Sequence, residues 1–265
     1  MGIASIVQFI SAKLGFSVKR GVALQDERYF LWPTLEMVIG TFLEKRNAAT
    51  FVQIGAYDGV DSDILHSWLE RYPLSGVLVE PVPETFEKLL AQCGHRSGLK
   101  FENVAISPRG DSQPFYRLYP DYLERARHPV KSRPEPGQLS SFDPQHILKH
   151  VPYNGDWHDI IETLEIPCLS LSDLLAKHEI EALDLLLVDA EGADFPILME
   201  HDWESCKPSI VIFEHIHIPR RDREELIGKL IKEGYRWAPS GLNTIAVHES
   251  VDLKSGPGDF PTSPL

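Results

Sequence analysis

Short apolar runs alternate with helical patterns through most of the 265-residue chain, and this alternation limits its fold more than any other feature. Apolar runs that lack polar alternation are typical of strands buried on both faces, as in a parallel sheet covered by helices. We therefore expect an α/β fold with a mostly parallel sheet. Its last two strands are close enough in sequence to form an antiparallel hairpin at the sheet edge. The expected strands are 51–55, 76–80, 101–107, 183–189, 209–214, 235–238 and 244–247.

The segments between these runs have the apolar spacing of helices. A helix opened by Pro83 and stopped by Gly94 follows the rule that proline begins and glycine ends helices. Helical spacing also covers residues 60–69, 169–178, 195–204 and 224–232. The regular alternation indicates a doubly wound arrangement, with helices on both faces of the sheet.

Composition divides the chain into three parts, the second of which contains an insertion. Residues 1–49 are expected to form an N-terminal helical extension, which begins with apolar residues at helical spacing, and residues 50–249 the main domain. Residues 108–160 interrupt the alternation and are rich in proline and histidine, so we interpret them as an inserted lid or acceptor-binding segment; a solvated loop is the alternative. Residues 250–265 are rich in Gly, Pro and Ser, and a loose tail is expected. The apolar residues of the extension are Ile3, Ile6, Val7, Ile10 and Leu14.

The net charge and the cysteine content limit which binding partners and which cellular compartment are expected for this protein. Lys and Arg number 26 against 39 Asp and Glu, which gives a net charge of −13, so nucleic acid is not an expected partner. The three cysteines form no CxxC pair, which favours a reducing, cytoplasmic location over a disulfide scaffold. No apolar run is long enough for a transmembrane segment. A homodimer is left open.

Two motifs at strand ends point to a nucleoside-containing cofactor. The turn Gly55-Ala56-Tyr57-Asp58-Gly59 follows the first strand, where glycines let a ligand approach the backbone. Glu80-Pro81 ends the second strand, where a carboxylate can accept hydrogen bonds from both ribose hydroxyls. A full GxGxxG and a GxxxxGK[ST] are both absent, which disfavours pyrophosphate and triphosphate cradles. Either motif alone is equally consistent with a simple turn.

An ordered series of motifs resembles the FkbM-type S-adenosylmethionine-dependent methyltransferases. This resemblance implies the class I methyltransferase fold, a Rossmann-like, doubly wound sheet of about seven strands, with S-adenosylmethionine as cofactor. The series comprises Ile54–Gly59, Val79–Pro83, Asn103–Ile106, Leu139–Phe142, Leu171–Leu175, Asp184–Asp194 and Val211–His215.

The resemblance also implies roles for single residues. Gly55, Ala56 and Gly59 would face the methionine part of the cofactor, with Tyr57 and Asp58 in the same turn. Glu80, followed by Pro81, would hold the ribose. Asp189 would lie beside the amino group or the sulfonium, where a carboxylate favours a cationic donor. The residues expected beside the adenine are Asn103, Val104 and Ala105.

The expected reaction is methylation of a hydroxyl on a small-molecule acceptor, such as a sugar, a glycoside or a polyketide-like metabolite. A hydroxyl must lose its proton, so a base within hydrogen-bond reach helps. His215 and Glu191, near Asp189, are the candidates; for a histidine at a strand end, a bond to a carbonyl is the alternative. The acceptor pocket is expected to include Ser140, Ser141, Tyr153 and Trp157, although these side chains could equally anchor the insertion.

Three alternatives remain open at this point. Asp189, Glu191, Glu214 and His215 include oxygen ligands suited to Mg²⁺, but their spacing is not diagnostic, so no metal site is predicted. A non-catalytic protein that binds the cofactor or product and acts through an interface is the second alternative. A nicotinamide-dependent oxidoreductase is the third, and the missing third glycine counts against it.

Overall fold

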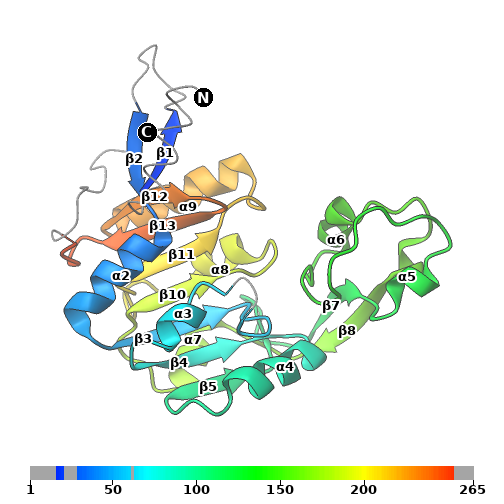
Figure 1. The fold of residues 1–265 in the computed structure, drawn as a ribbon, viewed down its shortest axis with the longest axis horizontal. Helices are drawn as coiled ribbons and strands as arrows, with labels where there is room; N and C mark the ends of the chain where they lie inside the picture. The colour runs from blue at the N-terminus through cyan, green and yellow to red at the C-terminus, as the bar shows by residue number, and fades with distance from the viewer. Residues whose placement is uncertain (1–15, 21–28, 61–62, 254–265) are drawn as a thin grey trace.

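The computed structural model describes residues 16–20, 29–60 and 63–253, and a seven-stranded sheet forms its centre (Figure 1). The strand order is β12-β13-β11-β10-β3-β4-β5. Neighbouring strands from β5 to β11 are parallel, and β13 runs antiparallel to both β11 and β12. The expected doubly wound class I methyltransferase sheet with an antiparallel edge hairpin is therefore confirmed. Its strands are β3 (Ala49–Ile54), β4 (Leu74–Val79), β5 (Leu99–Glu102), β10 (Leu185–Val188), β11 (Ile210–Glu214), β12 (Tyr235–Ser240) and β13 (Asn243–His248).

Helices cover both faces of this sheet, and the side chains of each central strand point alternately to the two layers. In β3, Phe51 packs in the core on one face, whereas its neighbour Val52 packs in the core on the other. Both residues are fully buried, which explains why the strand has no polar alternation. The first face carries α2 (Leu35–Arg46), α3 (His66–Leu69) and α4 (Pro83–Cys93); the second carries α7 (Leu171–Lys177), α8 (Asp194–Glu200) and α9 (Arg220–Lys232).

Two expected elements differ from the structure. Among the described residues of the helical pattern over 60–69, only the single turn α3 is helical. The expected third strand, 101–107, is divided into β5 and the short β6 (Ala105–Ile106), which pairs with β9 (Cys168–Leu169) outside the main sheet. The division falls at Asn103, whose side-chain amide donates to the backbone oxygens of Glu80 and Pro81 at 2.8 and 3.1 Å. These bonds hold the chain where it leaves the sheet.

Residues 113–166 form a projection that extends from the main body (Figure 1). An antiparallel ribbon of β7 (Gln113–Leu118) and β8 (Ile161–Ile166) carries the projection. The chain between these two strands contains α5 (Tyr122–Arg125), α6 (Pro144–His150) and the 3-10 turn η1 (Trp157–Asp159). The expected insertion, 108–160, lies largely within it, but the projection continues to Ile166 because β8 pairs with β7. Its own small core contains Leu118, Tyr122, Ile147, Val151, Ile160 and Ile161.

The structure describes only part of the expected N-terminal helical extension. The apolar residues Ile3 to Leu14 lie outside the described residues. Phe16–Arg20 forms strand β1, which pairs antiparallel with β2 (Tyr29–Pro33), so the helical expectation is wrong for both segments, whereas α2 in the same extension is helical. Backbone pairing with the neighbouring strand β2 outweighs the local pattern there. Within the described ranges, no helix is long and apolar enough to span a bilayer.

Candidate active site

A cavity of about 510 Å³ opens at the carboxyl ends of β3, β4, β10 and β11. This edge of a parallel sheet is where α/β proteins bind their ligands. The main sheet supplies the glycine turn after β3, Glu80 after β4 and Asp189 after β10. The projection supplies Phe115 and residues 137–140. Two parts of the chain therefore share one cavity.

Gly55 turns the backbone sharply at the end of β3. Its φ is +78°, and the N–H groups of Gly55 and Ala56 both donate to the backbone oxygen of Val79 at 3.0 Å. A Cβ atom at Gly55 would lie 1.9 Å from the backbone oxygen of Asp189, closer than any real contact. Only glycine fits this position, because the backbone that follows β10 lies directly against the turn.

Glu80 presents a fixed carboxyl group at the end of β4. Its side chain is 4% exposed, and its two oxygens accept hydrogen bonds from the N–H groups of Tyr57 and Val82 at 3.1 and 2.9 Å. Burial raises the pKa of Glu80 to about 8, against the lowering effect of the two N–H donors. The group has lone pairs left for hydroxyl donors in the cavity.

The other predicted cofactor residues divide into two groups. Ala56, Tyr57, Pro81, Val104 and Ala105 line the cavity together with Gly55 and Glu80. Asp58, Gly59 and Asn103 do not: the Asp58 carboxylate accepts from the N–H of Val60, Gly59 packs on α4, and the Asn103 amide holds the backbone after β4.

Gln53 and Asp63, which are not among the predicted site residues, form a polar pair in the cavity. The Gln53 amide donates to Asp63 Oδ1 at 3.2 Å. The other oxygens, Gln53 Oε1 and Asp63 Oδ2, are buried without a hydrogen-bond partner. Buried acceptors of this kind cost free energy unless a donor meets them, so the pair fits a ligand with N–H groups. A polar residue inside an otherwise apolar strand was the available signal.

Three carboxyl groups that line the cavity lie close to one another, from Asp189, Glu191 and Glu214. Burial, and then the neighbouring Asp189, raise the pKa of Glu191 to about 8. Burial, and then Asp189 and Glu191, raise the pKa of Glu214 to about 8 as well. Burial also raises the pKa of Asp189. Such crowding of acids is costly without a cationic partner.

His217, rather than the predicted His215, faces the cavity. The two residues would share a strand face only if β11 continued, but β11 ends at Glu214. His215 Nδ1 lies 3.0 Å from Thr244 Oγ1, and His215 does not line the cavity. His217 Nε2 lies 3.2 Å from Glu214 Oε2 and 3.8 Å from Glu191 Oε2. Burial, with the neighbouring His146 and His150, lowers the pKa of His217 to about 4.

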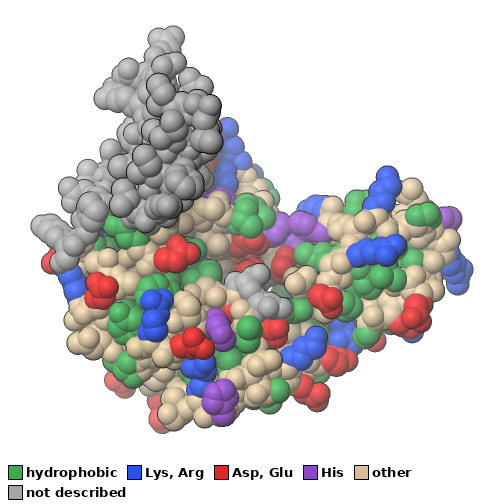
Figure 2. All heavy atoms as spheres, in the orientation of Figure 1, with side chains coloured by type: hydrophobic (Ala, Val, Ile, Leu, Met, Phe, Trp, Pro, Cys, Tyr) green, Lys and Arg blue, Asp and Glu red, His purple; other side chains and the backbone are tan. Residues whose placement is uncertain are grey.

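The residues predicted to bind the acceptor also differ in whether they line the cavity. Ser140 lines the cavity, and the Ser141 hydroxyl donates to the backbone oxygen of Glu191 at 2.8 Å. Tyr153 and Trp157 do not line it; both are partly buried and pack against the core of the projection. A hollow between the main body and the projection is bordered by acidic and histidine side chains (Figure 2).

A family model described as the methyltransferase FkbM domain matches residues 53–237, more than half of the chain. The chain belongs to the FkbM methyltransferase family. The matched range begins at Gln53 and ends at Trp237, so it includes the glycine turn, Glu80, the acidic group and the projection. No curated protein matches this FkbM chain.

Solved structures resemble the FkbM chain at low identity. An FkbM methyltransferase from Methylobacillus flagellatus KT is 11% identical, with 76% of this chain and 44% of that chain covered and a TM-score of 0.45. The chain thus spans less than half the length of that protein. A fibrillarin/Nop5p complex is 12% identical, with coverage of 89% and 97% and a TM-score of 0.38. The Methanococcus jannaschii fibrillarin pre-rRNA processing protein is 11% identical, with 88% of each chain covered and a TM-score of 0.38.

Proposed function

We propose that this FkbM chain is an S-adenosylmethionine-dependent O-methyltransferase whose acceptor is a hydroxyl of a small molecule such as a sugar, a glycoside or a polyketide-like metabolite. The observation that carries the proposal is the buried carboxyl of Glu80, held by two backbone N–H groups where it opens into the cavity. An acid at the end of the second strand is the partner that a ribose diol requires.

The residues present fit this cofactor along the length of the cavity. Glu80 would accept the ribose hydroxyls, and Val104 and Ala105 would lie beside the adenine. Gly55 lines the cavity, and its backbone would lie beside the chain that joins the two ends of the cofactor. The unpartnered oxygens of Gln53 and Asp63 would accept from its ammonium group. When bound, S-adenosylmethionine supplies an electrophilic methyl group on a sulfonium sulfur.

The acceptor would enter from the side of the projection. Ser140 offers a hydroxyl there, and Glu191 and His217 offer groups that can take a proton from an acceptor hydroxyl. We propose these two residues for that role instead of His215, whose ring is held by Thr244. The cavity wall from residues 137–140 and Phe142 would fix the acceptor oxygen relative to the methyl group, and such alignment supplies much of the rate.

The first test is calorimetric titration of the full chain with S-adenosylmethionine and with S-adenosylhomocysteine. We expect one molecule of either ligand to bind per chain, with a Kd in the micromolar range. Methyl transfer would then be followed with radiolabelled donor over a panel of sugars, glycosides and polyketide-like alcohols. Absence of binding by both ligands contradicts the proposal, and so does transfer confined to nitrogen or thiol acceptors.

The raised pKa of Glu80 predicts that nucleoside binding depends on pH. Ribose hydroxyls donate to the ionised carboxylate, so below a pKa of about 8 binding must first release a proton. Affinity for 5′-methylthioadenosine, which stays uncharged here, should rise by up to about tenfold per pH unit below the pKa and level off above it. Asp63, Asp189, Glu191, Glu214 and His217 also face the cavity, so Glu80→Gln serves as the control. A pH dependence that persists in that variant refutes the assignment to Glu80.

A further inference from the structure

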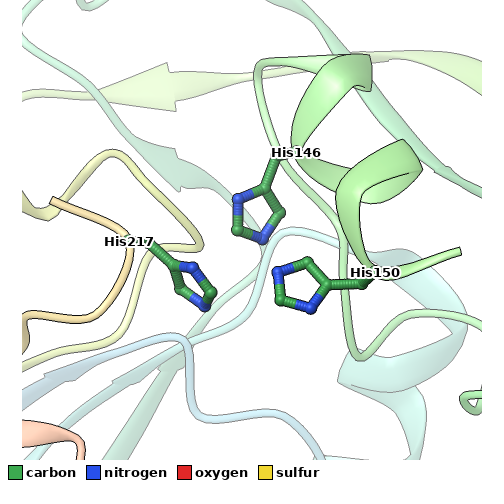
Figure 3. A group of neighbouring side chains, drawn as sticks. All are labelled: His146, His150 and His217. Carbon is green, nitrogen blue, oxygen red and sulfur yellow. The ribbon is translucent and has the colours of Figure 1, made fainter. Parts of the chain in front are cut away.

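Three histidines meet where the projection approaches the main sheet. His146 and His150 are four residues apart on α6, so both lie on one face of that helix. His217 follows β11 in the main body. Figure 3 shows the three rings turned toward one another. The ring centroids of His146 and His150 are 5.0 Å apart, and His217 lies 4.5 Å from the first and 5.0 Å from the second.

We propose that His146, His150 and His217 bind one divalent transition-metal ion of the Zn²⁺ type, with a carboxylate of Glu191 or Glu214 as a further ligand. One nitrogen of each ring lies within 4.8 Å of those of the other two. Small side-chain rotations would bring these nitrogens to the ~2 Å metal–ligand distance of histidine-bound zinc.

The two glutamates extend the same cluster. Glu191, Glu214 and His217 also place one ligand atom each within 4.8 Å of one another, so His217 belongs to both groups. Glu191 Oε2 lies 2.6 Å from His146 Nε2, and Glu214 Oε2 lies 3.2 Å from His217 Nε2. Each carboxylate is therefore close enough either to bind the ion or to orient a histidine that does.

The chemistry of this donor set selects the kind of cation. Imidazole nitrogen suits Zn²⁺, Fe²⁺, Ni²⁺ and Cu²⁺, whereas Mg²⁺ and Ca²⁺ prefer oxygen ligands and bound water. The side chains are largely removed from solvent, with 6% of His146 and 14% of His217 exposed. A dication there would also offset the negative charge of the acids that crowd this side of the cavity.

The position of the cluster gives the metal a role at the acceptor end. Glu191, Glu214 and His217 line the cavity, so an open coordination position of the ion would face it. A cation there would bind an acceptor hydroxyl oxygen and lower its pKa, in the way zinc acts on bound water. Because His217 would then be a ligand, the proton would pass to whichever of Glu191 and Glu214 does not bind the ion. This role rests on the proposed function; the metal site itself does not.

The decisive experiment measures metal binding without any cofactor. The full chain would be stripped with a chelator and titrated with Zn²⁺ by calorimetry, and with Co²⁺ by its visible absorption. We expect one ion per chain, and Mg²⁺ should not compete. Affinity for Zn²⁺ should fall by at least about 100-fold in His150→Ala, because loss of a ligand costs no less than loss of an outer-sphere partner.

A matched variant separates this site from ordinary surface histidines. His158 also lies on the projection, is exposed and contacts Asp156, so His158→Ala should bind Zn²⁺ as the wild type does. His217→Asn provides a second test from the main body, and circular dichroism would verify the fold of each variant. No stoichiometric Zn²⁺ binding, or equal affinity in all folded variants, overturns the site. Zn²⁺ binding without S-adenosylhomocysteine binding would overturn the proposed function instead.

Discussion

Replacing Glu80 with glutamine should weaken S-adenosylhomocysteine binding by about 100-fold, as expected when a carboxylate that accepts two ligand hydroxyls becomes a neutral amide. Glutamine has nearly the same volume, so the cavity keeps its shape. The glutamine side chain would, however, present an N–H₂ group where the backbone N–H of Tyr57 or of Val82 now donates to a carboxylate oxygen of Glu80. The measurement is calorimetry at a pH of about 9, where the wild-type carboxyl is ionised because its pKa is about 8.

Glu102→Gln is the matched control for this experiment. Glu102 is also a buried acid at a strand end, one strand away, but its carboxylate is held by Lys177 and His178 and does not line the cavity. Its variant should bind S-adenosylhomocysteine like the wild type. If Glu80→Gln retains full affinity, Glu80 serves only to hold the backbone of the turn.

Substituting alanine for Gly55 should cost about 3 kcal/mol or more of stability, from left-handed backbone strain and overpacking together. The new Cβ would lie 1.9 Å from the backbone oxygen of Asp189, and a backbone atom cannot yield as a flexible side chain can. The strands β3 and β10 would have to separate at their carboxyl ends. Urea unfolding measures the loss, and S-adenosylhomocysteine binding should fall with it.

Gly241→Ala isolates the clash from the backbone strain. Gly241 also has a positive φ, +62°, but nothing lies within 4 Å of its hypothetical Cβ. The variant should therefore lose only about 1 kcal/mol, the cost of the left-handed conformation. Equal destabilisation of the two variants would mean that the close approach of Asp189 to Gly55 is unimportant.

The sheet could be predicted because its strands are buried on both faces. Phe51 and Val52 point to opposite layers and are both apolar, which leaves a continuous run that reads as a central strand. The short helix α3 could not be predicted in this way. Trp68 in this helix and Leu65 directly before it are buried as a helical face would be, although α3 is a single turn. The apolar spacing in this segment therefore reflects the burial of these side chains and does not require a long helix.

The candidate site was predictable where it follows from the sheet alone. Gly55, Glu80 and Asp189 each end a strand, and parallel strands bring their carboxyl ends to one edge. The histidines were not predictable from that rule. His217 lies beyond the end of β11, where the alternation of side chains stops, and α6 reaches it only through the fold of the projection. The four-residue spacing of His146 and His150 was the available signal.

The strand order has a consequence for synthesis on the ribosome. The centre of the sheet pairs β3 with β10, and the Thr50 N–H donates to the Asp184 carboxylate across 134 residues of sequence. In a nascent chain, the edge of β3 that pairs with β10 therefore stays unpaired until most of the protein has been synthesised. Unpaired apolar edges promote association, and distant pairings form slowly. Nascent chains of this protein should depend on holding chaperones until β10 emerges, and C-terminal truncations before Leu185 should aggregate.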